Sequence, residues 1–200
     1  NTGNGNLSVV AGIITVNSVV TADGSGDVTL NAAGLLTVNA AVSSTTGDLS
    51  LTGGTGVTHT AAGNLTTSGV GTISVTATAN NITMADGTMY TNTAGTGGIT
   101  LLAATNVAVG EITATTGSSA IGITATSGAI TDTTAAETAN LTSTGTATLT
   151  AATGIGAAGA SDIDTTLGTL VATNTTSGDI FVQESDGLII GGTGVLTQGG

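Results

Sequence analysis

The chain has 200 residues, among them 33 Gly, 12 acidic residues and no Lys, Arg, Pro or Cys, and its formal net charge is −12. Without cationic side chains it cannot neutralise phosphates, which excludes nucleic acids and anionic membrane surfaces as direct partners. The absence of Cys excludes disulfides, thiolate zinc sites and Cys nucleophiles. Aromatic residues make up 1% of the chain, too few to fill a thick globular core, while the 39% of hydrophobic residues argues against disorder.

Short strand motifs repeat from the start of the chain. The motif GNLSV at residues 5–9 returns as GDVTL at 26–30 and as GDLSL at 47–51, and GIITVN at 12–17 returns as GLLTVN at 34–39. Apolar residues alternate with Ser or Thr in these motifs, a period of two that is typical of a β-strand with one buried face. Two strands therefore repeat together, with Gly or Gly-Asp at the turns between them.

Looser copies of the same pattern continue to the end of the chain. They lie at residues 71–75, 98–101, 110–114, 128–131, 140–142, 161–165 and 178–182. No stretch keeps the spacing of an amphipathic helix, and the Ala-rich stretch at 133–139 is interpreted as a loop or a strand. The spacing of the copies drifts, so the turns vary in length while the strands persist.

A repeat of this length cannot bury its apolar face alone, so the coils must stack. The sequence predicts an all-β fold, a β-solenoid or parallel β-helix of about nine coils with roughly 21–22 residues per coil. Stacked strands would pair their backbone groups with the coils above and below, which fits the absence of Pro. Residues 1–200 form one repeat segment in this interpretation. An antiparallel β-sandwich is the alternative fold.

The motifs at 47–52, 128–132, 162–166 and 178–182 resemble strand repeats of very large bacterial surface proteins. These are the filamentous-haemagglutinin-like exoproteins and autotransporter passenger adhesins of Gram-negative bacteria. The resemblance implies a right-handed parallel β-helix, export across the bacterial envelope, and a role in adhesion or in a surface fibre. The complete lack of Lys and Arg departs from many such passengers.

Acidic and amide side chains recur directly after the turn glycine. Asn6, Asp27 and Asp48 occupy the same place in three successive motifs, so stacking would bring them into one column. Like charges one strand spacing apart repel, and hard oxygen ligands suit calcium. Asp27 and Asp48 are therefore candidate calcium ligands, and calcium is the only cofactor considered. The alternative is that Asp and Asn are here simply good turn residues.

The chain also contains residues of the types that serve in catalysis. His59 aligns near Val38 and is interpreted either as a buried, hydrogen-bonded imidazole or as a residue on a coil corner. A single His at no recognisable spacing makes no triad. Asp162 and Asp164 share one strand face by period two, as do Glu184 and Asp186. Such carboxylate pairs serve glycoside hydrolysis in some β-helix enzymes. Neither pair has aromatic platforms or basic residues nearby, so both are interpreted as surface acids.

Repeat-like sequence reaches both ends, which predicts uncapped ends with unpaired strand edges. The expected function is that of a non-enzymatic structural protein, extracellular or at the cell surface, in a fibre, adhesin stalk or matrix filament. The expected partners are further repeats of the same chain or other copies end to end, and a glycan or host-surface target, with no membrane insertion. The alternatives are a calcium- or glycan-binding module, a polysaccharide-degrading β-helix enzyme and an ice-binding protein with stacked Thr-x-Thr strings.

Overall fold

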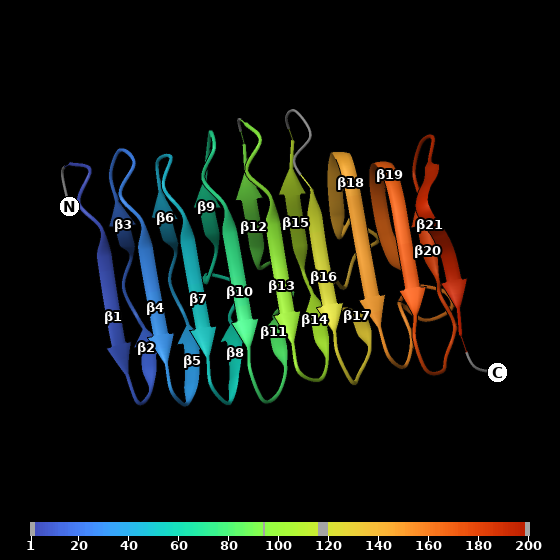
Figure 1. The fold of residues 1–200 in the computed structure, drawn as a ribbon, viewed down its shortest axis with the longest axis horizontal. Coiled ribbons are helices and arrows are strands. Elements are labelled where there is room, and N and C mark those ends of the chain that lie inside the picture. The colour runs from blue at the N-terminus through green and yellow to red at the C-terminus, as the bar shows by residue number, and fades with distance from the viewer. Residues whose placement is uncertain (1–2, 94, 116–119, 199–200) are drawn as a thin grey trace.

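The computed structural model describes residues 3–93, 95–115 and 120–198, so the outermost residues of the predicted 1–200 segment lie outside its described part. These residues form a β-solenoid in which the paired strands are parallel and no helix occurs. The stack has about eight turns, close to the nine predicted. In Figure 1 the chain advances from left to right while its front strands run downward and its rear strands run upward, which makes the coil right-handed.

Each regular turn contributes three strands, and each strand pairs with its counterparts in the turns before and after. The first face consists of β1 (Leu7–Ala11), β4 (Val28–Ala32), β7 (Leu49–Gly53), β10 (Ile73–Ala77), β13 (Ile99–Ala103) and β16 (Ile121–Ala125). The second face consists of β2 (Ile14–Val16), β5 (Leu35–Val38), β8 (Gly56–His59), β11 (Ile82–Met84), β14 (Val107–Val109) and β17 (Ile130–Asp132). The third face consists of β3 (Val20–Ala22), β6 (Val42–Ser44), β9 (Leu65–Thr67), β12 (Met89–Asn92) and β15 (Glu111–Ala114).

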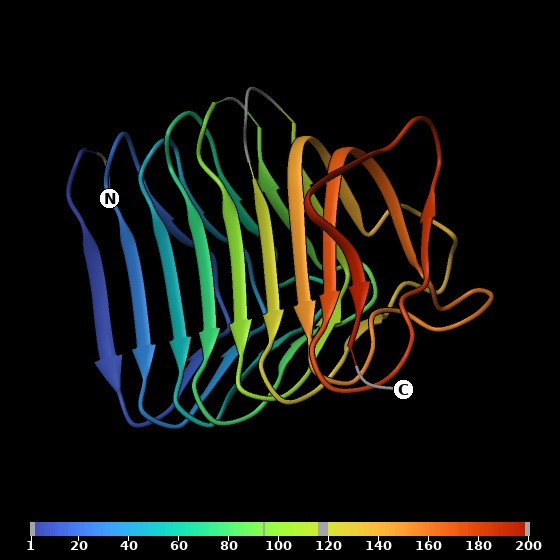
Figure 2. The ribbon, with the colours of Figure 1, turned by 45° about the vertical axis from the view of Figure 1, so that its right-hand side comes forward.

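Toward the C-terminus the third and first faces merge. The long strand β18 (Leu141–Ala151) pairs with β15 through its first residues and with β16 through its last ones, and a register shift lies between Ser143 and Thr146. The next long strand, β19 (Ile163–Asn174), follows β18 on both faces and pairs with β20 (Val182–Glu184) and β21 (Ile189–Thr197). Figure 2 shows these long strands curving from one face of the rod to the next.

The predicted registry of the first repeats is confirmed. Leu7 pairs with Val28 and Val28 pairs with Leu49 on the first face, while Ile14 pairs with Leu36 on the second. The prediction of two strands per coil was wrong, because each regular turn has three. A third strand such as β3 is only three residues long and therefore shows no period in the sequence. The later copies at 110–114 and 128–131 consequently belong to the third and second faces, not to the first.

The turns are longer than predicted in the middle of the rod. Paired residues are 21 positions apart between Leu7 and Val28 but 26 apart between Ile73 and Ile99. The extra residues lie at the corners, where the chain changes face, and they do not disturb the paired strands. Longer corners account for the difference between nine predicted turns and about eight observed ones.

The core is a set of aliphatic columns that run the length of the rod. In β7, Leu49 and Leu51 are fully buried while Ser50 and Thr52 face outward, as the alternation predicts. One column joins Val9 on β1, through Leu30, Leu51 and their counterparts, to Val195 on β21. Stacking therefore gives each small side chain two apolar neighbours along the column.

Candidate functional site

The column predicted from Asn6, Asp27 and Asp48 is formed. Oδ1 of Asn6 accepts a hydrogen bond from the backbone amide of Asp27, and Oδ1 of Asp27 accepts one from the amide of Asp48. The donor–acceptor distance is 2.9 Å in both. Oδ1 of Asp48 accepts bonds from the amide and hydroxyl of Thr72 over 2.7 and 2.8 Å. Each side chain thus satisfies an amide of the following turn. Calcium binding by Asp27 and Asp48 stays a prediction.

The same device recurs at a second corner, which sequence reasoning missed. Oδ1 of Asn81 accepts the amide of Asn106 over 3.0 Å, and Oδ1 of Asn106 accepts the amide of Ala129 over 2.9 Å. The signal was available in the sequence, since Asn81 directly precedes strand β11 and Asn106 directly precedes β14. At these corners a side-chain oxygen, in place of a backbone carbonyl, accepts the hydrogen bond from the backbone amide of the next turn.

His59 is buried at the end of β8, in register with Val38 and Met84. Its Nδ1 lies 2.7 Å from the carbonyl oxygen of Gly63, and its ring meets Tyr90 edge to face at 5.1 Å between centroids. Burial lowers the pKa of His59 to about 4, because the charged form would lose its hydration. The imidazole is therefore neutral near pH 7, and Nδ1 donates to Gly63.

The two acid pairs differ in their surroundings. Glu184 accepts a hydrogen bond from the hydroxyl of Thr165 over 2.9 Å and bonds from the amide of Leu167 over 3.1 and 3.3 Å, so it supports the neighbouring turn. Its partner Asp186 is exposed and accepts a local hydrogen bond from the backbone amide of Gly187. Asp162 and Asp164, in contrast, lie in a larger acidic group.

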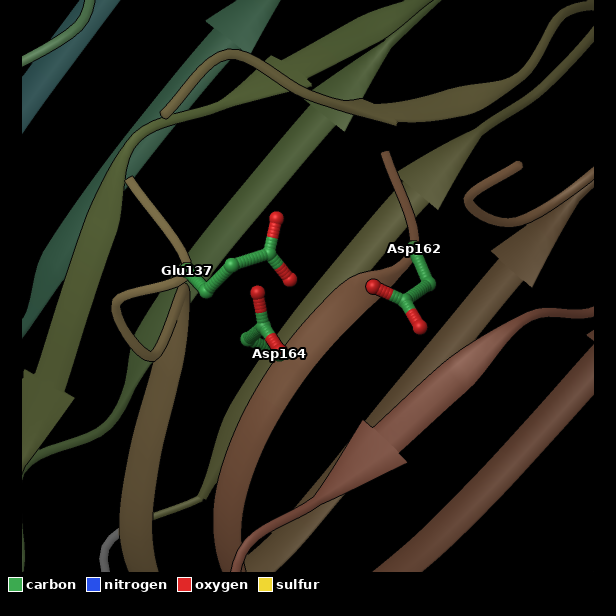
Figure 3. Close-up of side chains that lie close together, drawn as sticks. All are labelled: Glu137, Asp162 and Asp164. Carbon is green, nitrogen blue, oxygen red and sulfur yellow. The ribbon is translucent and has the colours of Figure 1, made fainter. Parts of the chain in front are cut away.

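This acidic cluster consists of Glu137, Asp162 and Asp164. Each offers one carboxylate oxygen as a possible metal ligand, and these three oxygens all lie within 4.8 Å of one another. In Figure 3 the carboxylates of Glu137 and Asp164 face each other, and Asp162 approaches from the adjoining segment. Glu137 is exposed, Asp162 is half-buried and Asp164 is only 7% exposed. Glu137 was not singled out from the sequence, because its position beside Asp162 depends on how the turns stack.

Two widened corners bring the cluster together. In the first two turns three residues suffice between the second and third faces, but residues 133–140 separate β17 from β18. In the next turn, residues 156–162 separate Ile155 from β19 and fold back through an antiparallel bridge between Ala157 and Ser161. Both corners project from the rod in Figure 2. Glu137 lies in the first corner and Asp162 ends the second.

Asn140 holds the buried side of the cluster. It is fully buried, and its Oδ1 accepts the backbone amide of Asp164 over 2.9 Å. Its Nδ2 donates to Oδ1 of Asp132 over 2.6 Å and to the carbonyl of Gly110 over 3.2 Å. Oδ1 of Asp132 also accepts the amide and hydroxyl of Thr134. The backbone at Asp164 is therefore fixed to the end of β17.

The carboxylate of Asp164 has no such partner. Among the described residues no group donates a hydrogen bond to it, and Oδ1 of Asp162 is buried without a hydrogen-bond partner. Burial raises the pKa of Asp164, and the charges of Asp162, Glu137 and Asp132 raise it further. The chain has no Lys or Arg, so no side-chain ammonium or guanidinium exists to compensate these acids.

The two end faces of the rod expose its core. At the first turn, Leu7, Val9, Ile14 and Val16 contribute to the lining of an open hollow of about 410 Å³. Val9 is 40% exposed, although its neighbour in the column, Leu30, is buried. At the last turn, Ile190 and Val195 on β21 are exposed as well. The edge of β1 away from β4 has no pairing strand among the described residues.

The outward face of the first sheet does not carry an unbroken Thr surface. Thr52, Thr76 and Thr124 follow one column, but Leu102 interrupts it between Thr76 and Thr124. In the neighbouring column, Gly122 stands between Thr100 and Thr148. Regular Thr-x-Thr ladders were the basis of the ice-binding alternative, which stays a prediction.

No protein-family model, no curated protein and no solved structure matches this chain. Among the described residues, no helix is both long and apolar enough to cross a membrane. The β-solenoid fold is thus established from the arrangement of the strands themselves. The resemblance of the repeat motifs to those of haemagglutinin-like exoproteins and autotransporter adhesins is not supported by these comparisons.

Proposed function

We propose that this chain is a rod segment of an extracellular or cell-surface fibre, and that its role is structural, without catalysis. The observation that carries the proposal is the state of the two end faces. Each presents a strand edge together with an exposed apolar residue of the core column, Val9 at one end and Val195 at the other, and such edges associate with further strands unless they are blocked. Neither Lys nor Pro, which commonly block edges, occurs in the chain.

The partner that fits each end is another turn of the same kind. Val9 begins the core column that Val195 ends, so a turn placed beyond either residue would continue the column and its backbone ladder. Such a turn can come from further repeats of the same chain or from a second copy. Stacked turns then build a fibre whose strength comes from roughly one backbone hydrogen bond per residue, each contributing about 0.5–1.5 kcal/mol net.

An extracellular setting suits the composition. The chain offers no Lys or Arg to trypsin-like proteases and has no Cys that would depend on redox conditions. The resemblance of its motifs to filamentous-haemagglutinin-like and autotransporter repeats favours an adhesin stalk or a matrix filament. In that case a glycan or another host-surface group would be the adhesion target, bound elsewhere in the fibre or on its outward faces.

The experiment is to purify this segment, raise its concentration and follow its assembly by light scattering and electron microscopy. We expect thin unbranched fibres whose diffraction has an axial repeat of about 4.8 Å. Val9→Lys and Val195→Lys place a charge on the end faces and should suppress assembly. The matched control is Thr100→Lys, at an exposed outward position in the middle of the rod. Monomeric behaviour of the unmodified segment at all concentrations would refute end-to-end association.

A further inference from the structure

We propose that Glu137, Asp162 and Asp164 bind one calcium ion at the corner where the two widened turns stack. This site is separate from the column of Asp27 and Asp48, and it does not depend on the proposed structural function. Its ligands come from two successive turns, because Glu137 lies in the corner 133–140 while Asp162 and Asp164 lie at the end of the next corner and the start of β19.

The spacing of the oxygens fits an ion of this size. Calcium binds oxygens at 2.3–2.6 Å, so two of its ligands can be as far apart as about 4.6–5.2 Å. The donor atoms of the cluster lie within 4.8 Å of one another. Magnesium binds at 2.0–2.1 Å and its ligands are at most about 4.2 Å apart. The 4.8 Å bound therefore lies within the span of calcium ligands and exceeds that of magnesium ligands, which favours calcium.

The buried carboxylates supply the second and independent observation. Asp164 is nine-tenths buried, its carboxylate accepts no hydrogen bond from any described residue, and it points toward Glu137. Oδ1 of Asp162 is buried without a partner too. A buried carboxylate oxygen without a partner is costly, and folded proteins compensate it with a proton, a donor or a cation. No Lys or Arg exists in this chain, so any cation that compensates this oxygen comes from solution.

The surroundings hold the buried ligand, Asp164, in place before an ion arrives. The hydrogen bond from the amide of Asp164 to Oδ1 of Asn140 fixes the buried ligand, and Asn140 is itself bonded to Asp132 and Gly110. Asp132 adds negative charge nearby, but its Oδ1 already accepts three hydrogen bonds and so it supports the site without serving as a ligand. Glu137 is exposed, and water can complete the coordination from that side.

The consequence of binding is a link between neighbouring turns. The corner 133–140 is held at its two ends, where Thr133 donates to the carbonyl of Val109 and Asn140 to that of Gly110, and Glu137 lies exposed between them. A shared ion would tie this corner to the start of β19. It would thereby stabilise the region where β18 and β19 pass from the third face to the first, and where the ladder has its register shift.

The test is calorimetric titration with calcium chloride after treatment with a chelator, together with thermal unfolding. An Asp27→Asn, Asp48→Asn background removes any contribution from the other column. We expect this background to bind one calcium ion per chain at about millimolar concentration or below and to melt at a higher temperature with calcium than with chelator. Magnesium at the same concentration should produce a smaller shift. An equal effect of magnesium would overturn the assignment of calcium.

Three further variants in this background locate the site. Asp164→Asn should weaken calcium binding by about tenfold or more, while folding normally in chelator because it removes repulsion between carboxylates. Glu137→Gln, at an exposed loop position, should also weaken binding and leaves the core untouched. The control is Asp186→Asn, which removes the same charge at an exposed position outside the cluster and should bind like the background. The proposal fails if the background does not bind calcium, or if Glu137→Gln and Asp164→Asn bind as tightly as Asp186→Asn.

Discussion

The backbone amide of Asp48 donates a hydrogen bond to Oδ1 of Asp27, one turn earlier, over 2.9 Å. The two carboxylates therefore stand in one column, yet each oxygen that lies between turns is occupied by an amide. The arrangement thus gives each acidic side chain a backbone amide of the next turn as its partner. Asn6 holds the same position in the first turn, so the column requires an acceptor oxygen and not a charge.

Substitution of Asp48 tests this interpretation. Asp48→Ala leaves the amide and hydroxyl of Thr72 without their acceptor and should lower the free energy of unfolding by about 1 kcal/mol. Asp48→Asn keeps the acceptor and should change stability little. Denaturation in urea without calcium measures both variants. A loss in the Asn variant as large as that in the Ala variant would show that the charge itself matters. A rise in melting temperature with calcium that Asp27→Asn and Asp48→Asn reduce would support a calcium ladder in this column.

Close stacking at the corners predicts a strong effect of one added methyl group. A Cβ on Gly54 would overlap the carbonyl oxygen of Ala33 in the preceding turn, whereas a Cβ on Gly12, in the first turn, meets no atom within 4 Å. Gly54→Ala should therefore destabilise the rod by about 1–3 kcal/mol, because the backbone of two turns must separate. Gly12→Ala should change stability little. Thermal unfolding of the two variants provides the comparison, and equal melting temperatures would contradict the packing described for this corner.

The buried imidazole predicts a dependence of stability on pH. The pKa of His59 is about 4 in the folded chain and 6.5 in an unfolded one, so the unfolded state takes up a proton first as the pH falls. Stability due to this group is present above pH 6.5 and is lost as the pH falls toward 4, by about 3 kcal/mol in all. Denaturant titrations at pH 7 and pH 4.5 measure the loss.

The control for this prediction is His59→Gln. A Gln side chain can still donate to the carbonyl of Gly63 but does not titrate. Its unfolding free energy should fall less between the two pH values than that of the unmodified chain, since only the carboxylates then contribute. Parallel pH profiles for the two proteins would mean that His59 is not responsible.

The sequence was sufficient to predict the stacking, because Leu7, Val28 and Leu49 repeat with their turn glycines at a constant interval. It did not reveal the third strand of each turn. Three residues such as those of β3 are too few to establish a period, and their strand character comes from pairing with β6. The number of residues in each corner could not be predicted from the sequence either. A corner has to span a certain distance, and no pattern of side chains marks its length.

The acidic cluster was predictable only in part. Asp162 and Asp164 are two positions apart, so the sequence alone suggested that they lie together. Glu137 lies 25 residues before Asp162, and only the stacking of two widened corners brings it to them. The burial of Asp164 also breaks the alternation of β19, where Ile163, Asp164 and Thr165 are all buried, because the corner 133–140 covers the strand. A covering loop leaves no trace in the period of the strand beneath it.

The ladder from β1 to β21 joins each turn only to the turns directly before and after it. Such an array can lose its outermost rung without disturbing the centre, so fraying starts at the two extremities and must travel inward to reach β10. The middle of the rod is protected by the number of rungs on either side of it. Lengthening the array would thus slow its unravelling without improving any individual contact.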